Sequence, residues 1–163
     1  MDRIRTALEL YKESEGVSSD RSASKRTAEH SFPSGITYTR TKSLTVPLPV
    51  LREHRVMAGS KFGPFTDAYK ILRTQVTQRL RENGWNTVGV TSPGYGEGKT
   101  LTAVNLAVSL AMETTHTVLL VDSDLQGPTV HHVFGLKNCL GLVDYLLDDQ
   151  PVEDLLIHPG IGR

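Results

Sequence analysis

Three glycines at alternate positions, Gly94, Gly96 and Gly98, separate two segments of very different character. The segment before them, Thr87–Thr91, is rich in β-branched residues and predicts a strand. The segment after them, Lys99 to about Thr114, contains many small and apolar residues. They would lie on most sides of a helix, which predicts a helix buried against a sheet. Glycine lets the backbone of the loop between them curl tightly. The order strand, loop, helix therefore predicts an α/β domain with a parallel sheet.

The end of this loop, Gly98-Lys99-Thr100, matches the last three positions of the phosphate-loop pattern G-x-x-x-x-G-K-S/T, although Pro93 occupies the first glycine position. In such a loop several backbone N–H groups point at one phosphate, and the following helix adds its positive dipole end. Lys99 is placed to contact the β- and γ-phosphates of a nucleotide, and the Thr100 hydroxyl is placed to ligate Mg²⁺. The loop therefore predicts a nucleotide-binding site.

A second apolar run, Thr117–Val121, has the continuous character of a parallel strand that is covered on both faces. Two carboxylates, Asp122 and Asp124, follow it directly. Ligands bind at the carboxyl ends of strands in open α/β sheets, so we expect both carboxylates near the phosphate loop. One of them can hold Mg²⁺ or its water, and one can polarise an attacking hydroxyl in phosphoryl transfer.

Composition argues against several classes of protein. The 18 Lys and Arg residues balance 18 Asp and Glu residues, which argues against a dedicated nucleic-acid binder. No apolar stretch approaches the about 20 residues of a membrane-spanning helix, and Met1–Arg5 is not followed by the apolar core of a secretory signal. The single cysteine, Cys139, excludes an internal disulfide. Adjacent His131 and His132 would point about 100° apart on a helix, which argues against a metal site. We expect a cytoplasmic protein.

The chain divides into three predicted regions. Residues 1–13 carry apolar residues at helical spacing and predict a short helix. Residues 14–64 are interpreted as a Ser/Thr-rich linker and extended segment, in which the prolines of Val46–Val50 hold the backbone extended. Residues 65–163 form the globular part. Its predicted helices span Asp67–Glu82, with Thr66 as N-cap, Thr129–Phe134 and Leu142–Leu147.

The phosphate loop and the Asp122-Ser123-Asp124 motif together resemble the bacterial tyrosine kinases of capsule and exopolysaccharide biosynthesis (BY-kinases). The loop resembles the Walker A segment of that family. Val118–Asp124 resembles its second motif, Walker A′, of the form D-x-D-x-R, with Gln126 in the arginine position. The resemblance covers most of Phe65–Gly162. It implies a P-loop NTPase-type parallel sheet flanked by helices, here incomplete and preceded by a flexible N-terminal leader.

The resemblance implies an ATP- and Mg²⁺-dependent protein-tyrosine kinase that regulates exopolysaccharide or capsule synthesis and export. Residues 65–163 would be the N-terminal part of its P-loop kinase domain. The implied catalytic residues are Lys99, Asp122 and Asp124, and Thr100 and Asp122 would hold Mg²⁺. The implied nucleotide-binding residues are Gly94, Gly96, Glu97, Gly98, Lys99, Thr100 and Leu101.

The family resemblance also implies partners. An E-x-x-R-x-x-R pattern mediates ring-like oligomerisation in the family, and the matching positions here are Asp67, Lys70 and Arg73. Charge is kept at each position, but two of the three residue types differ. Cytoplasmic members of the family work with a membrane-embedded polysaccharide chain-length protein. Such a partner would bring this chain to the inner face of the plasma membrane.

Two features of the family are missing from the sequence. No further apolar run closes on an aspartate, as the Walker B motif does. The family's C-terminal cluster of tyrosines, the target of autophosphorylation, is also absent. The tyrosines here are scattered along the chain: Tyr11, Tyr38, Tyr69, Tyr95 and Tyr145. We therefore expect a C-terminally truncated kinase domain whose own activity is impaired.

Two other functions stay as alternatives. In the first, the chain is a nucleotide-binding interaction module that docks on the membrane chain-length partner. In the second, it is a relative of the partition and division-site ATPases, which share the fold and carry a signature lysine in the form K-G-G-x-G-K-S/T. Gly94 occupies the position of that lysine, which favours the kinase.

Overall fold

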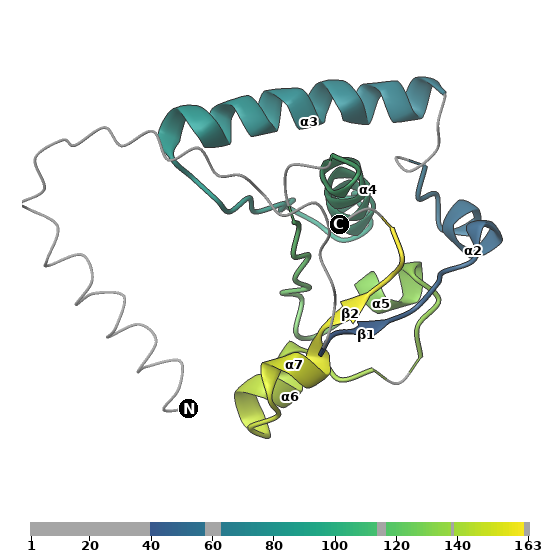
Figure 1. The fold of residues 1–163 in the computed structure, drawn as a ribbon, viewed down its shortest axis with the longest axis vertical. Helices are drawn as coiled ribbons and strands as arrows, with labels where there is room; N and C mark the ends of the chain where they lie inside the picture. Colours follow the sequence, from purple (N-terminus) through teal and green to yellow (C-terminus); the bar gives the residue numbers. More distant parts are fainter. Residues whose placement is uncertain (1–39, 58–62, 114–116, 138, 162–163) are drawn as a thin grey trace, which may run out of the picture.

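A computed structural model describes residues 40–57, 63–113, 117–137 and 139–161 of the chain. In Figure 1 the longest helix, α3, lies across α4, the strand pair lies on the other side of α4, and α2 lies to the right of α4. The predicted helix in residues 1–13 lies outside the described residues, as do residues 14–39 of the predicted linker. In chain order the elements are β1 (Lys42–Ser43), α2 (Leu48–Glu53), α3 (Pro64–Asn83), α4 (Lys99–Ala111), α5 (Val130–Val133), α6 (Leu142–Leu147), α7 (Val152–Leu155) and β2 (Ile157–His158).

Helix α3 begins earlier than predicted, and the predicted N-cap is wrong. Pro64 opens the helix, because a proline in the first turn has no N–H whose hydrogen bond could be lost. Thr66 therefore lies inside the first turn, buried, and its hydroxyl donates to the carbonyl of Met57 at 3.0 Å. The helix ends at Gly84, whose φ of 68° is the left-handed conformation of a glycine C-cap.

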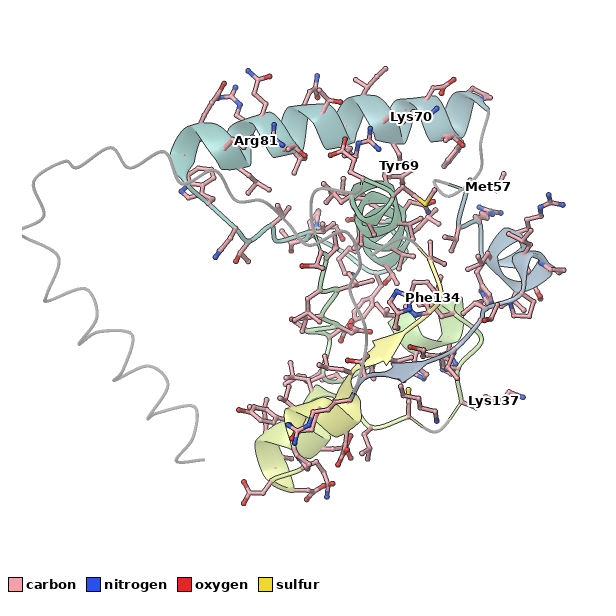
Figure 2. The ribbon with its side chains drawn as sticks, viewed as in Figure 1. Met57, Tyr69, Lys70, Arg81, Phe134 and Lys137 are labelled. Atoms are coloured by element: carbon pink, nitrogen blue, oxygen red, sulfur yellow. The ribbon has the colours of Figure 1, made fainter. Side chains whose placement is uncertain are left out.

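The predicted apolar face of α3 packs toward α4. The side chains that form this face are all half-buried: Tyr69, Leu72, Val76 and Leu80. Figure 2 shows Tyr69 on the side of α3 that faces α4, whereas Arg81 lies farther along α3. Arg73 ties the two helices together through an ion pair with Glu113 at 3.1 Å and a hydrogen bond to the carbonyl of Ser109 at 3.1 Å.

Helix α4 begins at Lys99, as predicted, and ends at Ala111. Its buried side includes Val104 and Val108, which form the core with residues from the segment before α3. That segment contributes Val46, Leu51 and Val56. The packed part of the chain therefore begins well before Phe65, where the sequence placed the start of the globular part.

The proline-containing segment that was predicted to be extended contains helix α2 instead. Pro47 is its N-cap in an extended conformation, and Pro49 falls in the first turn, where proline is tolerated. Leu51 can then turn into the core, where it is 8% exposed. The burial of this apolar side chain outweighs the extended preference of the prolines.

The two predicted strands do not pair with each other or with any other described segment. The backbone is extended into no β-ladder at Thr87–Thr91 or at Thr117–Val121. A strand needs a neighbour that takes up its backbone hydrogen bonds, and neither segment has one among the described residues. The second segment still shows the period of a strand, because Val118 and Leu120 are half-buried while Leu119 and Val121 are exposed.

The sheet of the described chain is a parallel pair formed by β1 and β2. Lys42 pairs with Ile157 and Ser43 with His158, and the Leu44 N–H continues the pairing to the His158 carbonyl at 2.8 Å. The pair is side by side in Figure 1. Helices combined with a small parallel sheet confirm the prediction of an incomplete α/β fold.

The short helices after Asp124 match the sequence predictions closely. Helix α5 lies within the predicted Thr129–Phe134, and α6 spans the predicted Leu142–Leu147. Phe134, at the end of α5, packs against the core below α4, whereas Lys137 lies at the outer edge (Figure 2). Helix α7 was not predicted. Among the helices that the structure describes, none combines the length and apolar character needed to cross a bilayer.

Candidate nucleotide-binding site

The glycine loop forms a cradle of backbone N–H groups in front of α4. Gly96 has a φ of 74° and Gly98 a φ of 90°, whereas Glu97 between them is not in the left-handed region. A Cβ atom at either glycine would meet no atom within 4 Å, so these positions need glycine for its backbone angle and not for space. Left-handed residues on either side of a residue of negative φ are typical of the backbone nests that bind anions.

Helix α4 places its N-terminus directly behind this cradle. The Thr102 N–H donates to the Gly98 carbonyl at 2.8 Å and closes the first turn. The free N–H groups of this turn carry the positive end of the helix dipole. Thr100 and Leu101 lie in the same turn, half-buried, and the Leu101 carbonyl accepts a hydrogen bond from the Asn105 amide. The predicted phosphate-binding segment therefore lies at the N-terminus of α4.

The charged side chains of the loop interact with the loop itself. Lys99 Nζ donates to the Gly94 carbonyl at 3.4 Å and lies 5.6 Å from the centre of the Tyr95 ring, a cation–π distance. Glu97 Oε2 accepts the Gly94 N–H at 3.1 Å. One N–H group at the start of the loop is thus already hydrogen-bonded to a carboxylate of the loop itself.

The carboxylate of Asp122 is held at the other side of the site by backbone groups. Its Oδ2 accepts the N–H of Thr129 at 2.8 Å and of Val130 at 3.0 Å, and its Oδ1 accepts the Asp124 N–H at 3.1 Å. Asp124 is exposed, and its Oδ1 accepts the Gly127 N–H at 3.2 Å. Asp122 therefore caps α5, and each carboxylate keeps lone pairs free for another partner.

Thr129 connects the two halves of the site, and the sequence analysis did not identify it as a site residue. Its hydroxyl lies 3.1 Å from the Thr100 hydroxyl, while its N–H binds Asp122. The structure thereby brings Lys99, Thr100 and Asp122 into one region. The sequence signal for Thr129 was its position at the start of a predicted helix, where a threonine usually acts only as a cap.

The other residues that the sequence analysis considered are not part of this region. Asp67 and Lys70 form an exposed ion pair on α3 at 3.0 Å, and Arg73 binds α4. The rings of His131 and His132 are neighbours, with centroids 3.9 Å apart and planes tilted by 41°. Within the described ranges, no group of three or more His, Cys, Asp or Glu side chains could hold a metal ion.

Two surface hollows lie beside α3, and the residues of the glycine loop line neither of them. One, of about 380 Å³, is lined by α3 residues and by Thr102, and the other, of about 790 Å³, by α3 residues and by Trp85, Thr87 and Val88. The first has mostly apolar walls, whereas polar and charged side chains, among them Gln78, Arg79 and Glu82, share the lining of the second.

The residues present fit a magnesium nucleotide. The cradle at Gly96 and Gly98 presents N–H donors to an anion, and the Lys99 ammonium adds a cation. Thr100 and Asp122 supply hydroxyl and carboxylate oxygens, the ligands that Mg²⁺ prefers. The glycine loop, α4 and Asp122 together are typical of a P-loop nucleotide-binding domain.

Comparison with known proteins agrees with this class. Residues 88–143 match the family model of the CobQ/CobB/MinD/ParA nucleotide binding domain. The matched stretch contains the glycine loop, α4 and both carboxylates. No solved structure gives a significant match.

Individual relatives are tyrosine kinases and a partitioning protein. The chain is 40% identical over 88 residues to tyrosine-protein kinase YwqD of Bacillus subtilis. The aligned part covers 54% of this chain and 37% of YwqD. It is 29% identical over 96 residues to tyrosine-protein kinase etk of Escherichia coli K12, covering 59% of this chain and 13% of that kinase. It is 45% identical over 85 residues to chromosome partitioning protein ParA of Myxococcus xanthus, covering 48% of this chain and 29% of that protein.

The matches to YwqD and etk support the resemblance to the bacterial tyrosine kinases. The chain spans 37% of the length of YwqD and less of the other two relatives. The similarity is therefore to a part of these proteins and not to their whole length.

Proposed function

We propose that this chain is the nucleotide-binding part of an ATP- and Mg²⁺-dependent protein-tyrosine kinase that regulates exopolysaccharide or capsule synthesis. The observation that carries the proposal is the N–H cradle of Gly96 and Gly98 at the start of α4, with Asp122 joined to the same site through Thr129. The similarity to YwqD and etk, both named tyrosine-protein kinases, supports the choice among P-loop functions.

Each site residue has a role in this proposal. When bound, Mg-ATP supplies the phosphoryl group that is transferred. The cradle and Lys99 bind the phosphates, while Thr100 and Asp122 hold the metal. Asp124, exposed beside Asp122, accepts the proton of the incoming tyrosine hydroxyl. Lys99 can turn to a phosphate because its present bond to the Gly94 carbonyl is long, at 3.4 Å.

Calorimetric titration of the 163-residue chain with Mg-ADP tests the binding part of the proposal. We expect saturable binding that Lys99→Ala abolishes. Lys70→Ala is a matched control, because Lys70 is an exposed lysine of α3 whose ion pair partner, Asp67, lies on the same helix. Absence of binding by the folded wild-type chain would contradict the proposal. Loss of binding in both variants would mean that the Lys99 assignment is wrong.

Incubation with Mg-ATP, followed by detection of phosphotyrosine, tests the kinase activity. We expect phosphotyrosine that is absent in Lys99→Ala. Persistence of phosphotyrosine in that variant would show that the site has been assigned to the wrong residues.

A partition-type ATPase is the second candidate, favoured by the 45% identity to the Myxococcus xanthus partitioning protein over 85 residues. Against it, Gly94 stands where partition ATPases carry their signature lysine. This candidate predicts ATP hydrolysis that DNA or a membrane surface stimulates, with no phosphotyrosine. Assays of ATP hydrolysis and of phosphotyrosine formation on one preparation distinguish the partition-type ATPase from the kinase.

The proposed partner is a membrane-embedded polysaccharide chain-length protein, which would place the chain at the cytoplasmic face of the membrane. We also propose self-assembly through α3. Asp67 and Lys70 are available for it, with side chains 63% and 45% exposed, whereas Arg73 is 20% exposed and binds α4. A pull-down with the cytoplasmic tail of the partner tests the first proposal. The sedimentation of Lys70→Glu against that of wild type tests the second.

A further inference from the structure

The hydroxyl groups of Thr100 and Thr129 lie 3.1 Å apart, although the residues are 29 positions apart in the sequence. Thr100 belongs to the glycine loop and the first turn of α4. Thr129 immediately precedes α5, beyond the Asp122-Ser123-Asp124 motif. The contact therefore joins the phosphate loop to the segment that follows the Asp122-Ser123-Asp124 motif.

Asp122 fixes the backbone that carries the Thr129 hydroxyl. Its Oδ2 accepts the Thr129 N–H at 2.8 Å and the neighbouring Val130 N–H at 3.0 Å. Two bonds to adjacent amides restrict the orientation of this backbone more than one would. The side chain of Thr129 is consequently presented to Thr100 from a backbone that is anchored to the predicted metal-binding carboxylate.

A hydroxyl oxygen that ligates a cation must direct its own proton to an acceptor. A threonine hydroxyl has one proton and two lone pairs, so its oxygen can bind a metal only while the proton points elsewhere. For Thr100, Thr129 Oγ1 is an acceptor at hydrogen-bond distance. Thr129 can accept this proton because its own side chain is exposed and can donate to water.

We propose that Thr129 is a positioning residue that orients the Thr100 hydroxyl for Mg²⁺ and links it to Asp122. This inference rests on the proposed nucleotide-binding function. Thr129 belongs to neither the phosphate-loop pattern nor the D-x-D motif, so it adds a third contribution to the site. Since it acts through the metal-binding hydroxyl, its loss affects binding of the magnesium nucleotide and leaves binding of the free nucleotide unchanged.

Calorimetric titration of the full 163-residue chain with ADP, in the presence and absence of Mg²⁺, tests this inference. Thr129→Val removes the hydroxyl but keeps the N–H that binds Asp122. Because one exposed hydroxyl pair contributes little, we expect the Kd for Mg-ADP to rise about threefold to tenfold. The Kd for ADP without metal should not change, and Thr129→Ser should restore the wild-type value.

A double mutant distinguishes positioning from a general structural effect. In a Thr100→Val background the hydroxyl that Thr129 orients is gone, so Thr129→Val should have no additional effect. An equal effect in both backgrounds, or an equal loss with and without Mg²⁺, would overturn the inference. Should Thr129→Val fail to fold, Thr129→Ala in the same comparisons gives the same two outcomes.

Failure of the inference and failure of the proposed function give different results. If wild type binds Mg-ADP and Thr129→Val binds it equally tightly, only the inference is overturned. If the folded wild-type chain binds no ADP in either condition, the proposed function is overturned, and the inference with it.

Discussion

The side-chain oxygen of Asn105 accepts the backbone N–H of Met57 at 2.9 Å, across a separation of 48 residues. The amide nitrogen of the same side chain donates to the carbonyls of Arg55 and Leu101 at 3.1 and 3.0 Å. Asn105 is fully buried in α4. It therefore fastens the segment before α3 to the helix that carries the phosphate loop.

Replacing Asn105 should destabilise the whole packed region. Asn105→Ala leaves the half-buried Met57 N–H and the Arg55 carbonyl without this partner, so we expect a loss of about 2 to 3 kcal/mol in the free energy of unfolding. Urea denaturation measures it. Asn83→Ala is the matched control, because Asn83 is exposed and its amide bonds only to the Arg79 carbonyl of its own helix. Equal losses in the two variants would show that Asn105 has no special role.

The ion pair between Arg73 and Glu113 should contribute more to stability than the pair between Lys70 and Asp67. Arg73 and Glu113 join α3 to the end of α4 and are 20% and 34% exposed, whereas the other pair is largely solvated within one helix. A double-mutant cycle with Arg73→Met and Glu113→Gln should give a coupling energy of about 1 kcal/mol.

The same cycle with Lys70→Met and Asp67→Asn is the control for this prediction. We expect a coupling energy below about 0.5 kcal/mol for that exposed pair, because solvent and salt screen it. A larger coupling for the exposed pair than for Arg73 and Glu113 would contradict the assignment of α3 docking to Arg73.

Three glycine-to-alanine substitutions should differ in a fixed order. Gly160 has a φ of 74°, and a Cβ there would lie 2.7 Å from the Leu44 carbonyl oxygen, so Gly160→Ala combines backbone strain with a clash. Gly84 has a φ of 68° but open space, so Gly84→Ala should lose only the backbone term of about 1 kcal/mol. Gly89 has neither feature and should be near neutral. Thermal unfolding of the three variants measures the order, and a Gly160→Ala as stable as Gly89→Ala would contradict the close approach of Gly160 to Leu44.

Removing the Glu97 carboxylate should tighten nucleotide binding. Its oxygen accepts the Gly94 N–H at 3.1 Å and places a negative charge in the loop that is to receive phosphate. We expect Glu97→Ala to lower the Kd for Mg-ADP about threefold at low salt, with a smaller gain at high salt. Calorimetry at two salt concentrations measures this effect.

Glu53→Ala is the control for that prediction, because Glu53 is an exposed carboxylate of α2. Its Kd should equal that of wild type. A weaker affinity in Glu97→Ala would mean that the carboxylate supports the loop and does not compete with phosphate.

Local patterns predicted much of the candidate site. The glycine spacing located the loop, and the helix after it begins at the predicted Lys99. Helix α6 also lies where the sequence placed it. These features depend on residues that are close in sequence, so composition and spacing carry the information.

Long-range contacts were not predictable in the same way. Thr66 was expected to cap a helix but binds Met57, and Thr129 reaches Thr100 across the site. The runs Thr87–Thr91 and Thr117–Val121 have strand composition, yet pairing depends on which neighbour is available, and composition does not contain that information. Pairing of β1 with β2 rests on two residues in each strand, too few for a pattern.

The pairing of β1 with β2 has a consequence for the order of folding. Lys42 cannot pair until Ile157 has been synthesised, so on the ribosome β1 waits for nearly all of the described chain. The entropy of closing so long a loop must be offset by contacts already formed inside it, such as those between α3 and α4. We therefore expect the strand pair to form late, after α3 and α4 have packed together. We also expect it to be among the first contacts to open when the protein unfolds.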